Sequence, residues 1–431
     1  MWVVLVADSK RWEALKRPTP GWFNRAKLGF FIHWGPYSVP AWGEPIAELG
    51  TIPPQQWFKH NPYAEWYYNT IRIPGSPAAK HHQEIHGDCH YDDFLDQWQA
   101  EAFDAVSLVS QLAEAGASYL VLTTKHHDGV CLWDAPQTGD RNTVARGPKQ
   151  DLVGAYVDAC REVGLRFGAY YSGGLDWHIR PSEPIGLDEN WEIFNRPNDS
   201  EYASYAGGHL RDLISKYQPD ILWNDINWPD AGKNFGPTGI GRIFEEYYAQ
   251  HREGLVNDRW HTPHADYYTS EYQHLKTAED AQVWEHCRGV GLSFGYNQVE
   301  TGEHGLSGPQ TIRHLIDVVS RGGRLLLGVG PKANGQLPDW QLKVVTEIAT
   351  WMKPAGEFLT DLTPTDQPLD IPGAWVRTGQ SPQGKIAFID PLSPDPVTIP
   401  AAKLLTPQWG TLKNNILTFD PNRPGPLVVI F

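Results

Sequence analysis

Basic side chains, cysteines and long apolar runs are all scarce in this chain of 431 residues. Its 36 Lys and Arg face 51 Asp and Glu, which gives a formal net charge of −15. Nucleic acids and anionic membranes are therefore disfavoured as partners, because both require a basic surface. No run of about 18 apolar residues occurs, so we expect no membrane-spanning helix. Residues 1–7 are apolar but too short for a secretory signal.

The four cysteines, Cys89, Cys131, Cys160 and Cys287, are widely spaced and include no CxxC pair. This spacing argues against a zinc ribbon or a redox motif. Together with the lack of a signal segment, it predicts free thiols and a cytoplasmic location. His126 and His127 are adjacent, whereas metal-dependent barrel hydrolases typically use a His-x-His spacing that keeps both rings on one face. We therefore expect neither a metal nor another cofactor.

Aromatic residues are abundant, at 12% of the chain with 19 Trp and 18 Tyr. Exposed aromatic rings suit sugars, whose C–H faces pack on rings while their hydroxyls seek polar partners. A tryptophan-rich core would explain the same composition, so composition alone does not decide between the two interpretations.

Helix-like and strand-like segments alternate from about residue 104. Helical periodicity at 105–113, Leu152–Val163 and 209–217 precedes apolar strands at 119–124, 165–171 and Ile221–Asp225. Further strand candidates are residues 29–33, 254–257, 282–286, 292–296 and Arg324–Val329. Eight strands of this kind predict an α/β fold, a (β/α)8-like barrel over residues 1–355. No GxGxxG follows a strand, which disfavours a doubly wound dinucleotide-binding sheet.

Helical periodicity ends after about residue 353, and short strand-like runs punctuated by proline and glycine follow. Residues 356–431 are therefore predicted to form a small C-terminal antiparallel β-sandwich.

Polar side chains stand where the barrel strands are predicted to end, the place where barrel enzymes carry their catalytic groups. They include His33, His126, Tyr170, Asp225 and Arg259. A GxSxG string occurs at residues 291–295, but no helix is expected directly after it, so it does not indicate a nucleophilic serine. The remaining polar groups are carboxylates and histidines, accompanied by aromatic rings. These are the groups found in glycoside hydrolases, which use two carboxylates for catalysis. Capping of the following loop is the alternative role for Asp225.

Several strings together resemble the α-L-fucosidases of glycoside hydrolase family 29. They lie at residues 31–35, 61–67, 124–129, 170–177, 222–229, 256–260 and 291–297, and include the sequences TTKHHDG, YYSGGLDW and LWND. The resemblance runs in order over about residues 10–355. It implies a barrel followed by a β-sandwich, which is also what the periodicity predicts.

The resemblance implies an exo-acting, retaining double displacement on a small-molecule or oligosaccharide substrate with a terminal α-L-fucose. Asp225 would be the nucleophile and Glu271 the acid/base, with Glu285 and Glu65 as the competing carboxylates for the second role. The residues that the resemblance assigns to the sugar hydroxyls are His33, Glu65, Trp66, His126, His127 and Arg259, and Tyr170 and Phe294 would supply ring contacts.

Two other functions remain open at this point. One is a carbohydrate-binding protein without catalysis, against which the intact Asp225 and Glu271 argue. The other is a related barrel hydrolase acting on another sugar such as galactose. The sequence also leaves a homo-oligomer open.

Overall fold

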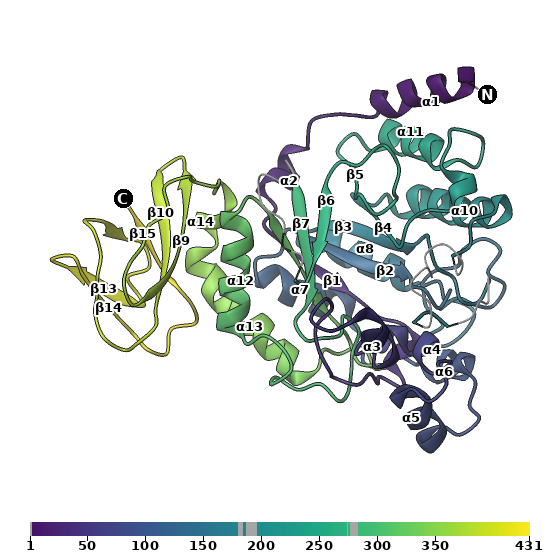
Figure 1. Ribbon diagram of the computed structural model, residues 1–431, viewed down its shortest axis with the longest axis horizontal. Coiled ribbons are helices and arrows are strands. Elements are labelled where there is room, and N and C mark those ends of the chain that lie inside the picture. The colour runs from purple at the N-terminus through teal and green to yellow at the C-terminus, as the bar shows by residue number, and fades with distance from the viewer. Residues whose placement is uncertain (1, 180–183, 187–195, 274, 276–282) are drawn as a thin grey trace.

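The computed structural model describes residues 2–179, 184–186, 196–273, 275 and 283–431. Its larger part is built on one sheet of eight parallel strands (Figure 1), in the order β5-β4-β3-β2-β1-β8-β7-β6. The strands are β1 (Leu28–Ile32), β2 (Tyr119–Lys125), β3 (Arg166–Ser172), β4 (Ile221–Asp225), β5 (Leu255–Val256), β6 (Tyr268–Glu271), β7 (Trp284–Gly289) and β8 (Arg324–Val329). This curled sheet confirms the predicted barrel, with β5 and β6 at its two ends.

Most of the barrel strands are buried on both faces, as a parallel sheet covered by helices requires. Every residue of β1, β2, β4, β7 and β8 is buried. The covering helices are α7 (Ala105–Glu114), α8 (Leu152–Val163), α10 (Ser200–Tyr217), α11 (Ile240–Gln250), α12 (Gly308–Ser320) and α13 (Asp339–Ala355). Side chains of Asp104, Asp151, Asp199 and Ser307 cap the first turns of four of them, which fixes where those helices begin.

The prediction of a strand at residues 292–296 was wrong. Those residues form a loop after β7, because their backbone amides donate to buried carboxylates: Ser293 N to Glu300 and Gly295 N to Glu65. The eighth strand is β6, which is short, polar and partly exposed. The helix predicted at 209–217 begins earlier, at Ser200. Residue 282, the first of the strand predicted at 282–286, lies outside the described residues.

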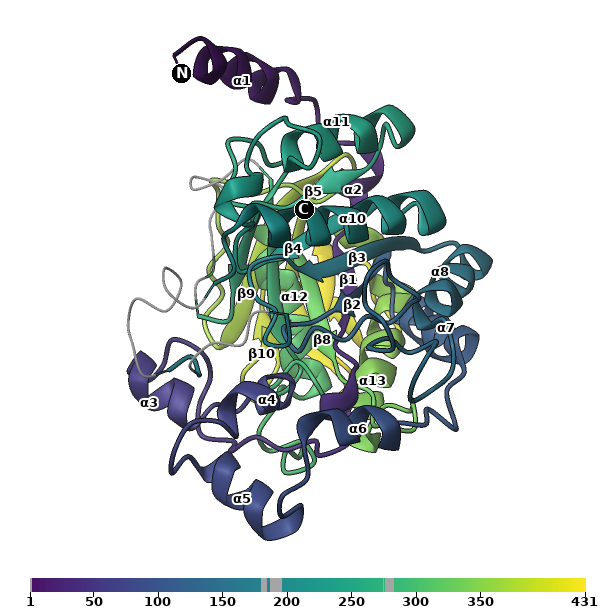
Figure 2. The same cartoon turned by 90° about the vertical axis from the view of Figure 1, so that its right-hand side faces the viewer.

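Most of the chain between β1 and β2 lies outside the sheet. It contains η1 (Pro36–Ser38), α3 (Pro54–Lys59), η2 (Ala64–Trp66), α4 (Tyr67–Thr70), α5 (Pro77–Ile85) and α6 (Tyr91–Gln97). Figures 1 and 2 both show α3 to α6 gathered on one side of the barrel. Before β1, α1 (Trp2–Ala14) projects beside α11, with Trp12 packed against Phe244, and α2 (Gly21–Arg25) lies close to the sheet. Across the part of the chain that the structure describes, no helix has the length and apolar character needed to cross a membrane.

The C-terminal part, after the short helix α14 (Glu357–Thr360), contains two antiparallel sheets. One has the order β12-β15-β10-β9 and the other β11-β14-β13. Their strands are β9 (Ala374–Ser381), β10 (Gly384–Pro391), β11 (Val397–Thr398), β12 (Lys403–Leu404), β13 (Gly410–Lys413), β14 (Ile416–Phe419) and β15 (Leu427–Ile430). Ile389, Val429 and Leu417 share one apolar core between the sheets, as predicted for a sandwich. Figure 1 shows these strands beside α12 and α13.

Candidate active site

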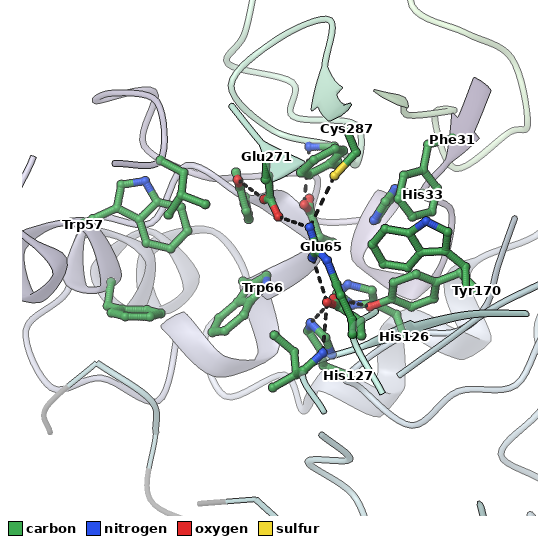
Figure 3. A pocket seen from close by; sticks show the side chains of 18 residues that line it. Phe31, His33, Trp57, Glu65, Trp66, His126, His127, Tyr170, Glu271 and Cys287 are labelled. Atoms are coloured by element: carbon green, nitrogen blue, oxygen red, sulfur yellow. Dashed lines mark hydrogen bonds and ion pairs between the residues drawn. The ribbon is translucent and has the colours of Figure 1, made fainter. Parts of the chain in front are cut away.

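The carboxyl ends of the barrel strands and the insertion before β2 enclose a cavity of about 170 Å³ (Figure 3). All ten predicted site residues line it: His33, Glu65, Trp66, His126, His127, Tyr170, Asp225, Arg259, Glu271 and Phe294. Its volume is below the roughly 300–1,000 Å³ of common ligand pockets. The cavity therefore suits one sugar ring better than an extended chain.

Asp225 ends β4 and is 8% exposed, with its carboxylate held by three donors. Its Oδ1 accepts hydrogen bonds from Ile226 N at 3.0 Å and Arg259 Nη1 at 2.9 Å. Its Oδ2 accepts one from the Tyr170 hydroxyl at 2.9 Å. These donors fix the direction in which the carboxylate points. The residue after it, Ile226, has φ of 56°, a strained conformation for a β-branched side chain and typical of functional sites.

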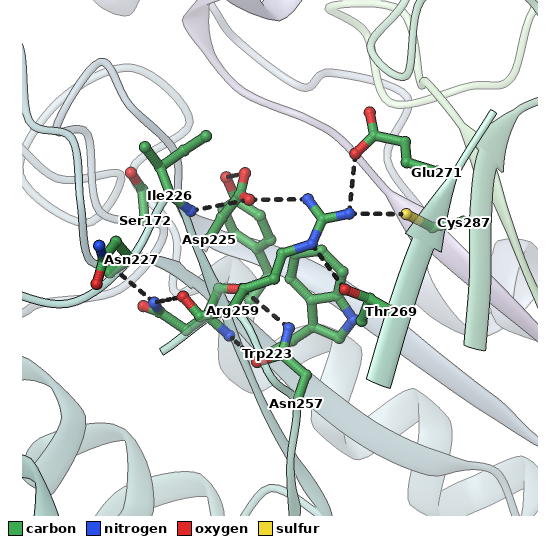
Figure 4. A network of polar contacts seen from close by, with 12 residues as sticks. Ser172, Trp223, Asp225, Ile226, Asn227, Asn257, Arg259, Thr269, Glu271 and Cys287 are labelled. Atoms are coloured by element: carbon green, nitrogen blue, oxygen red, sulfur yellow. Dashed lines mark hydrogen bonds and ion pairs between the residues drawn. The ribbon is translucent and has the colours of Figure 1, made fainter. Parts of the chain in front are cut away.

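Arg259 joins Asp225 to a second carboxylate, Glu271 at the end of β6 (Figure 4). Its Nη2 donates to Glu271 Oε2 at 2.8 Å, while its Nε donates to Thr269 Oγ1 at 3.0 Å. The guanidinium also lies over the Trp223 ring, 4.7 Å from the centroid. One planar cation therefore positions both carboxylates, a task for which its fixed fork of donors is suited.

Three buried histidines form the polar wall of the cavity. Burial lowers the pKa values of His33, His126 and His127 well below the ordinary range, and neighbouring cationic groups lower them further. The rings are therefore neutral near pH 7 and offer both donors and acceptors. Among the described residues, the Nδ1 atoms of His33 and His126 are buried and have no hydrogen-bond partner.

The hydrogen bonds around His127 fix its tautomer. Ser172 Oγ donates to Leu175 O at 2.8 Å, so its single proton is not available to His127 Nδ1, which lies 2.6 Å away. Nδ1 must therefore carry the proton and donate to Ser172. The other nitrogen, Nε2, is an acceptor that faces Asp225 Oδ2 at 3.7 Å, too far for a direct hydrogen bond.

Glu65 is buried at 1% exposure and binds the loop after β7. Its carboxylate accepts hydrogen bonds from Ser293 Oγ and Gly295 N, both at 2.9 Å, and from Phe294 N at 3.3 Å. Burial raises the pKa of Glu65 to about 7, although these hydrogen bonds oppose the shift. Glu65 therefore holds Phe294 in the cavity wall, where the Phe294 ring stacks on His33 at 4.9 Å.

Rings from several elements complete the wall. Trp66 meets His127 edge to face at 5.3 Å, and Tyr170 stacks on His126 at 5.7 Å. Phe31 lies between Trp223 and Phe294, at 5.0 and 6.0 Å. Aromatic rings and polar side chains thus line the same small cavity, which suits a sugar with one hydrophobic edge.

The competing carboxylate Glu285 does not line the cavity. It is fully buried on β7, where its oxygens accept hydrogen bonds from the Tyr119 hydroxyl at 2.5 Å and Trp223 Nε1 at 2.8 Å. Its carboxylate therefore orients barrel side chains beneath the site. Among the described residues, no group of three or more His, Cys, Asp or Glu is placed to hold a metal ion.

Sequence reasoning did not single out several lining residues: Leu49, Trp57, Phe58, Tyr63, Ile226 and Cys287. Trp57 and Tyr63 lie in the aromatic-rich insertion, whose ring density was the available signal. Cys287 had none, because its place beside Glu271 depends on the pairing of β6 with β7. All four cysteines are free thiols in the structure.

A sugar-sized cavity at the carboxyl end of a parallel barrel, with two of its three carboxylates bound by one arginine, defines a glycoside hydrolase. A family model described as α-L-fucosidase matches residues 7–357. The α-L-fucosidase of Dictyostelium discoideum is 29% identical over 398 residues, which cover 90% of this chain and 82% of that protein. The chain belongs to the α-L-fucosidase family.

Solved structures agree with this assignment. The crystal structure of the Thermotoga maritima α-fucosidase in complex with fucose is 39% identical, with a TM-score of 0.82 and coverage of 97% of this chain and 98% of that one. A Bacteroides thetaiotaomicron α-L-fucosidase, described as a trapped covalent intermediate, has 19% identity and a TM-score of 0.69, covering 96% of this chain and 97% of that one. At that identity the likeness shows the shared fold.

Proposed function

We propose that the chain is an exo-acting, retaining α-L-fucosidase in which Asp225 is the nucleophile and Glu271 the acid/base. The observation that carries this assignment is the Arg259 guanidinium, which donates to both carboxylates at 2.9 and 2.8 Å. Two carboxylates fixed by one guanidinium at the same cavity supply the pair of groups that a double displacement requires.

In the first step, Asp225 attacks the anomeric carbon as Glu271 gives its proton to the departing glycosidic oxygen. The C–O bond to the leaving group breaks, and an ester bond to Asp225 forms. The hydrogen bonds from Tyr170 and Arg259 weaken as Asp225 loses its charge and becomes an ester. In the second step, Glu271 takes a proton from water, which attacks the same carbon and frees Asp225. Two inversions give net retention, in line with the covalent intermediate trapped in the Bacteroides relative.

The cavity wall accounts for the sugar. His33, His126 and His127 are neutral and present nitrogen atoms to ring hydroxyls, while Glu65, Trp66 and Arg259 complete the polar side. Phe294 and Tyr170, with Phe31, face the 6-methyl group of fucose. A terminal α-L-fucosyl residue suits a cavity of this size, and the Thermotoga relative was solved in complex with fucose. Galactose would bring a 6-hydroxyl to this apolar wall without a partner.

The nucleophile assignment is tested with Asp225→Gly and azide. The variant should lose roughly 10³-fold or more in hydrolysis of 4-nitrophenyl α-L-fucoside, because no covalent intermediate can form. Azide should then occupy the vacated space and yield the inverted β-L-fucosyl azide, identified by NMR. Near-normal turnover of the variant, or an α-azide product, would reject Asp225 as the nucleophile.

The acid/base assignment is tested with Glu271→Ala beside Glu285→Gln. Glu271→Ala should still form the fucosyl-enzyme from a substrate with a good leaving group, and azide should intercept it to give the retained α-azide. Glu285→Gln should show no azide rescue, because Glu285 lies outside the cavity. The opposite pattern in the two variants would transfer the role to Glu285.

The catalytic barrel is proposed to span residues 1–355, and the C-terminal β-sandwich residues 356–431. A panel of α1,2-, α1,3-, α1,4- and α1,6-linked fucosides, compared with a β-D-galactoside, identifies the natural substrate class. Turnover of the galactoside alone would overturn the proposed specificity, and turnover of no substrate would favour a binding protein.

A further inference from the structure

Tyr63 reaches the candidate acid/base from outside the barrel. It belongs to the insertion between β1 and β2, just before η2, and lines the cavity at 6% exposure. Its hydroxyl donates to Glu271 Oε1 at 3.1 Å, while Arg259 Nη2 donates to Glu271 Oε2 at 2.8 Å. Each carboxylate oxygen of Glu271 therefore has its own donor, and the two donors differ in kind.

We propose that Tyr63 is a positioning residue that orients Glu271 and strengthens it as the general acid, an inference that rests on the proposed acid/base role of Glu271. The phenol holds Oε1, the oxygen from which the proton leaves. Its hydrogen bond strengthens as Glu271 becomes a carboxylate, so it favours proton transfer to the departing oxygen.

The two donors make the oxygens of Glu271 unequal. A guanidinium has only N–H donors, so a proton on Oε2 would find no acceptor in Arg259. A hydroxyl can donate or accept, so Oε1 tolerates a proton beside Tyr63. The acidic proton of Glu271 therefore resides on Oε1. Tyr63 keeps its own proton throughout, because burial, and then the charge of Glu271, raise the pKa of the phenol well above its ordinary range.

Packing fixes the Tyr63 ring in this position. Trp57 meets it edge to face at 4.8 Å, and Phe294 does so at 5.6 Å. The backbone N–H of Tyr63 donates to Asn61 Oδ1 at 2.9 Å, and the next residue, Ala64, donates to Ser293 Oγ at 3.0 Å. Because packing already fixes the Tyr63 side chain, its hydrogen bond to Glu271 costs little conformational entropy.

Several other groups act on Glu271 and stay in place when Tyr63 is changed. Arg259 binds Oε2, and Asp225 shares that guanidinium. Cys287, the partner of Glu271 in the β6–β7 pairing, accepts from Arg259 at 3.4 Å. Tyr272 follows Glu271 in the chain, stacks on Tyr63 at 6.2 Å and donates to Leu292 O. Glu65 acts on Tyr63 itself, because its charge adds to the effect of burial and raises the pKa of the phenol further.

The experiment compares Tyr63→Phe with the parent enzyme through the pH dependence of kcat/KM. Tyr63→Phe removes one hydrogen-bond donor to the ionised form of Glu271. The alkaline limb of the kcat/KM profile should therefore move to higher pH by about one unit. With phenyl α-L-fucoside, whose phenolate is a poor leaving group, kcat/KM at the optimum should fall about tenfold, while α-L-fucosyl fluoride, which needs little protonation, should be far less affected. An unmoved limb with equal losses on both substrates would show that Tyr63 only packs.

Tyr67→Phe is the matched control. Tyr67 lies in the same insertion at 1% exposure, and its hydroxyl bonds His82 Nδ1 at 2.9 Å, outside the cavity. The same chemical change there should leave the pH profile in place. A shift equal to that of Tyr63→Phe would reject the proposal.

A double-mutant cycle separates this proposal from the proposed function. In a Glu271→Ala background, Tyr63→Phe should cost no further activity, because its partner is gone. If Glu271→Ala shows azide rescue but the two losses are additive, only the role of Tyr63 fails. If the rescue belongs to Glu285→Gln, the acid/base assignment itself fails.

Discussion

Arg259 shows how much of this site depends on the shape of one side chain. Its Nε, Nη1 and Nη2 donate to Thr269, Asp225 and Glu271, and its plane lies over Trp223. The position of Arg259 in the site could be predicted from the sequence, because Arg259 follows a predicted strand in a recognisable string. The bridging role could not, because it depends on the distance between β5 and β6, which no local pattern encodes.

Arg259→Lys should therefore reduce kcat/KM on the nitrophenyl fucoside by about 10²-fold although charge is conserved. A lysine has a point-like cation that cannot hold three acceptors in one plane, so the two carboxylates lose their fixed relation. Stopped-flow kinetics and a thermal melt would measure the effect. Arg288→Lys is the control, since Arg288 binds Glu48 at 2.7 Å and is absent from the cavity lining. Equal losses in both variants would contradict the bridging role.

At the scale of elements, sequence patterns located most barrel strands but misassigned one. Ile221–Asp225 and Arg324–Val329 were predicted with the observed bounds, because fully buried parallel strands are continuous apolar runs. Residues 292–296 looked similar, yet Glu65 and Glu300 bind their amides and hold them as a loop. β6 has a polar sequence and was missed, although it carries Glu271.

The carboxyl of Glu300, which binds the loop at residues 292–296, makes the free energy of unfolding depend on pH. The carboxyl is 4% exposed and accepts from Ser293 N at 2.8 Å, and burial raises its pKa to about 8. In the unfolded chain its value is about 4.3. Between these values the folded protein holds a proton that the unfolded chain releases, so stability is full below about pH 4 and decreases as pH rises to about 8. Glu65, with a pKa of about 7, acts with the same sign.

Glu300→Gln should remove the Glu300 part of this dependence. The amide oxygen can still accept from Ser293 N, but the side chain no longer ionises. Relative to the parent, the variant should gain unfolding free energy on the order of 4 kcal/mol between about pH 5 and about pH 9. Urea unfolding across that range measures the gain, with Glu303→Gln, an exposed change nearby, as the control. Parallel curves for Glu300→Gln and the parent would refute the assignment.

At the scale of the whole molecule, periodicity predicted both the barrel and the C-terminal sheets but not how they join. β10 alternates between two cores: Ile386 and Phe388 pack into the barrel-side core, while Ala387 and Ile389 pack between the C-terminal sheets. Phe388 lies 6.3 Å from Trp351 of α13. Ion pairs of Arg377 with Asp317, and of Arg313 with Asp390, also connect β9 and β10 to α12. Such contacts between distant segments leave no local trace in the sequence.

A strand that serves two cores should make them unfold together. Phe388 is fully buried, so Phe388→Ala should cost about 3–5 kcal/mol of stability through a cavity at this junction. The Phe388→Ala variant should keep its fucosidase activity under native conditions, because α12 and α13 lie between Phe388 and the candidate active site. During urea unfolding, the midpoints for loss of activity and for loss of the circular dichroism signal should shift together to a lower urea concentration. Leu392→Ala, at a side chain that is 66% exposed, should shift neither. If activity persisted to the parent's midpoint while part of the dichroism was lost early, the C-terminal sheets would be unfolding independently of the barrel.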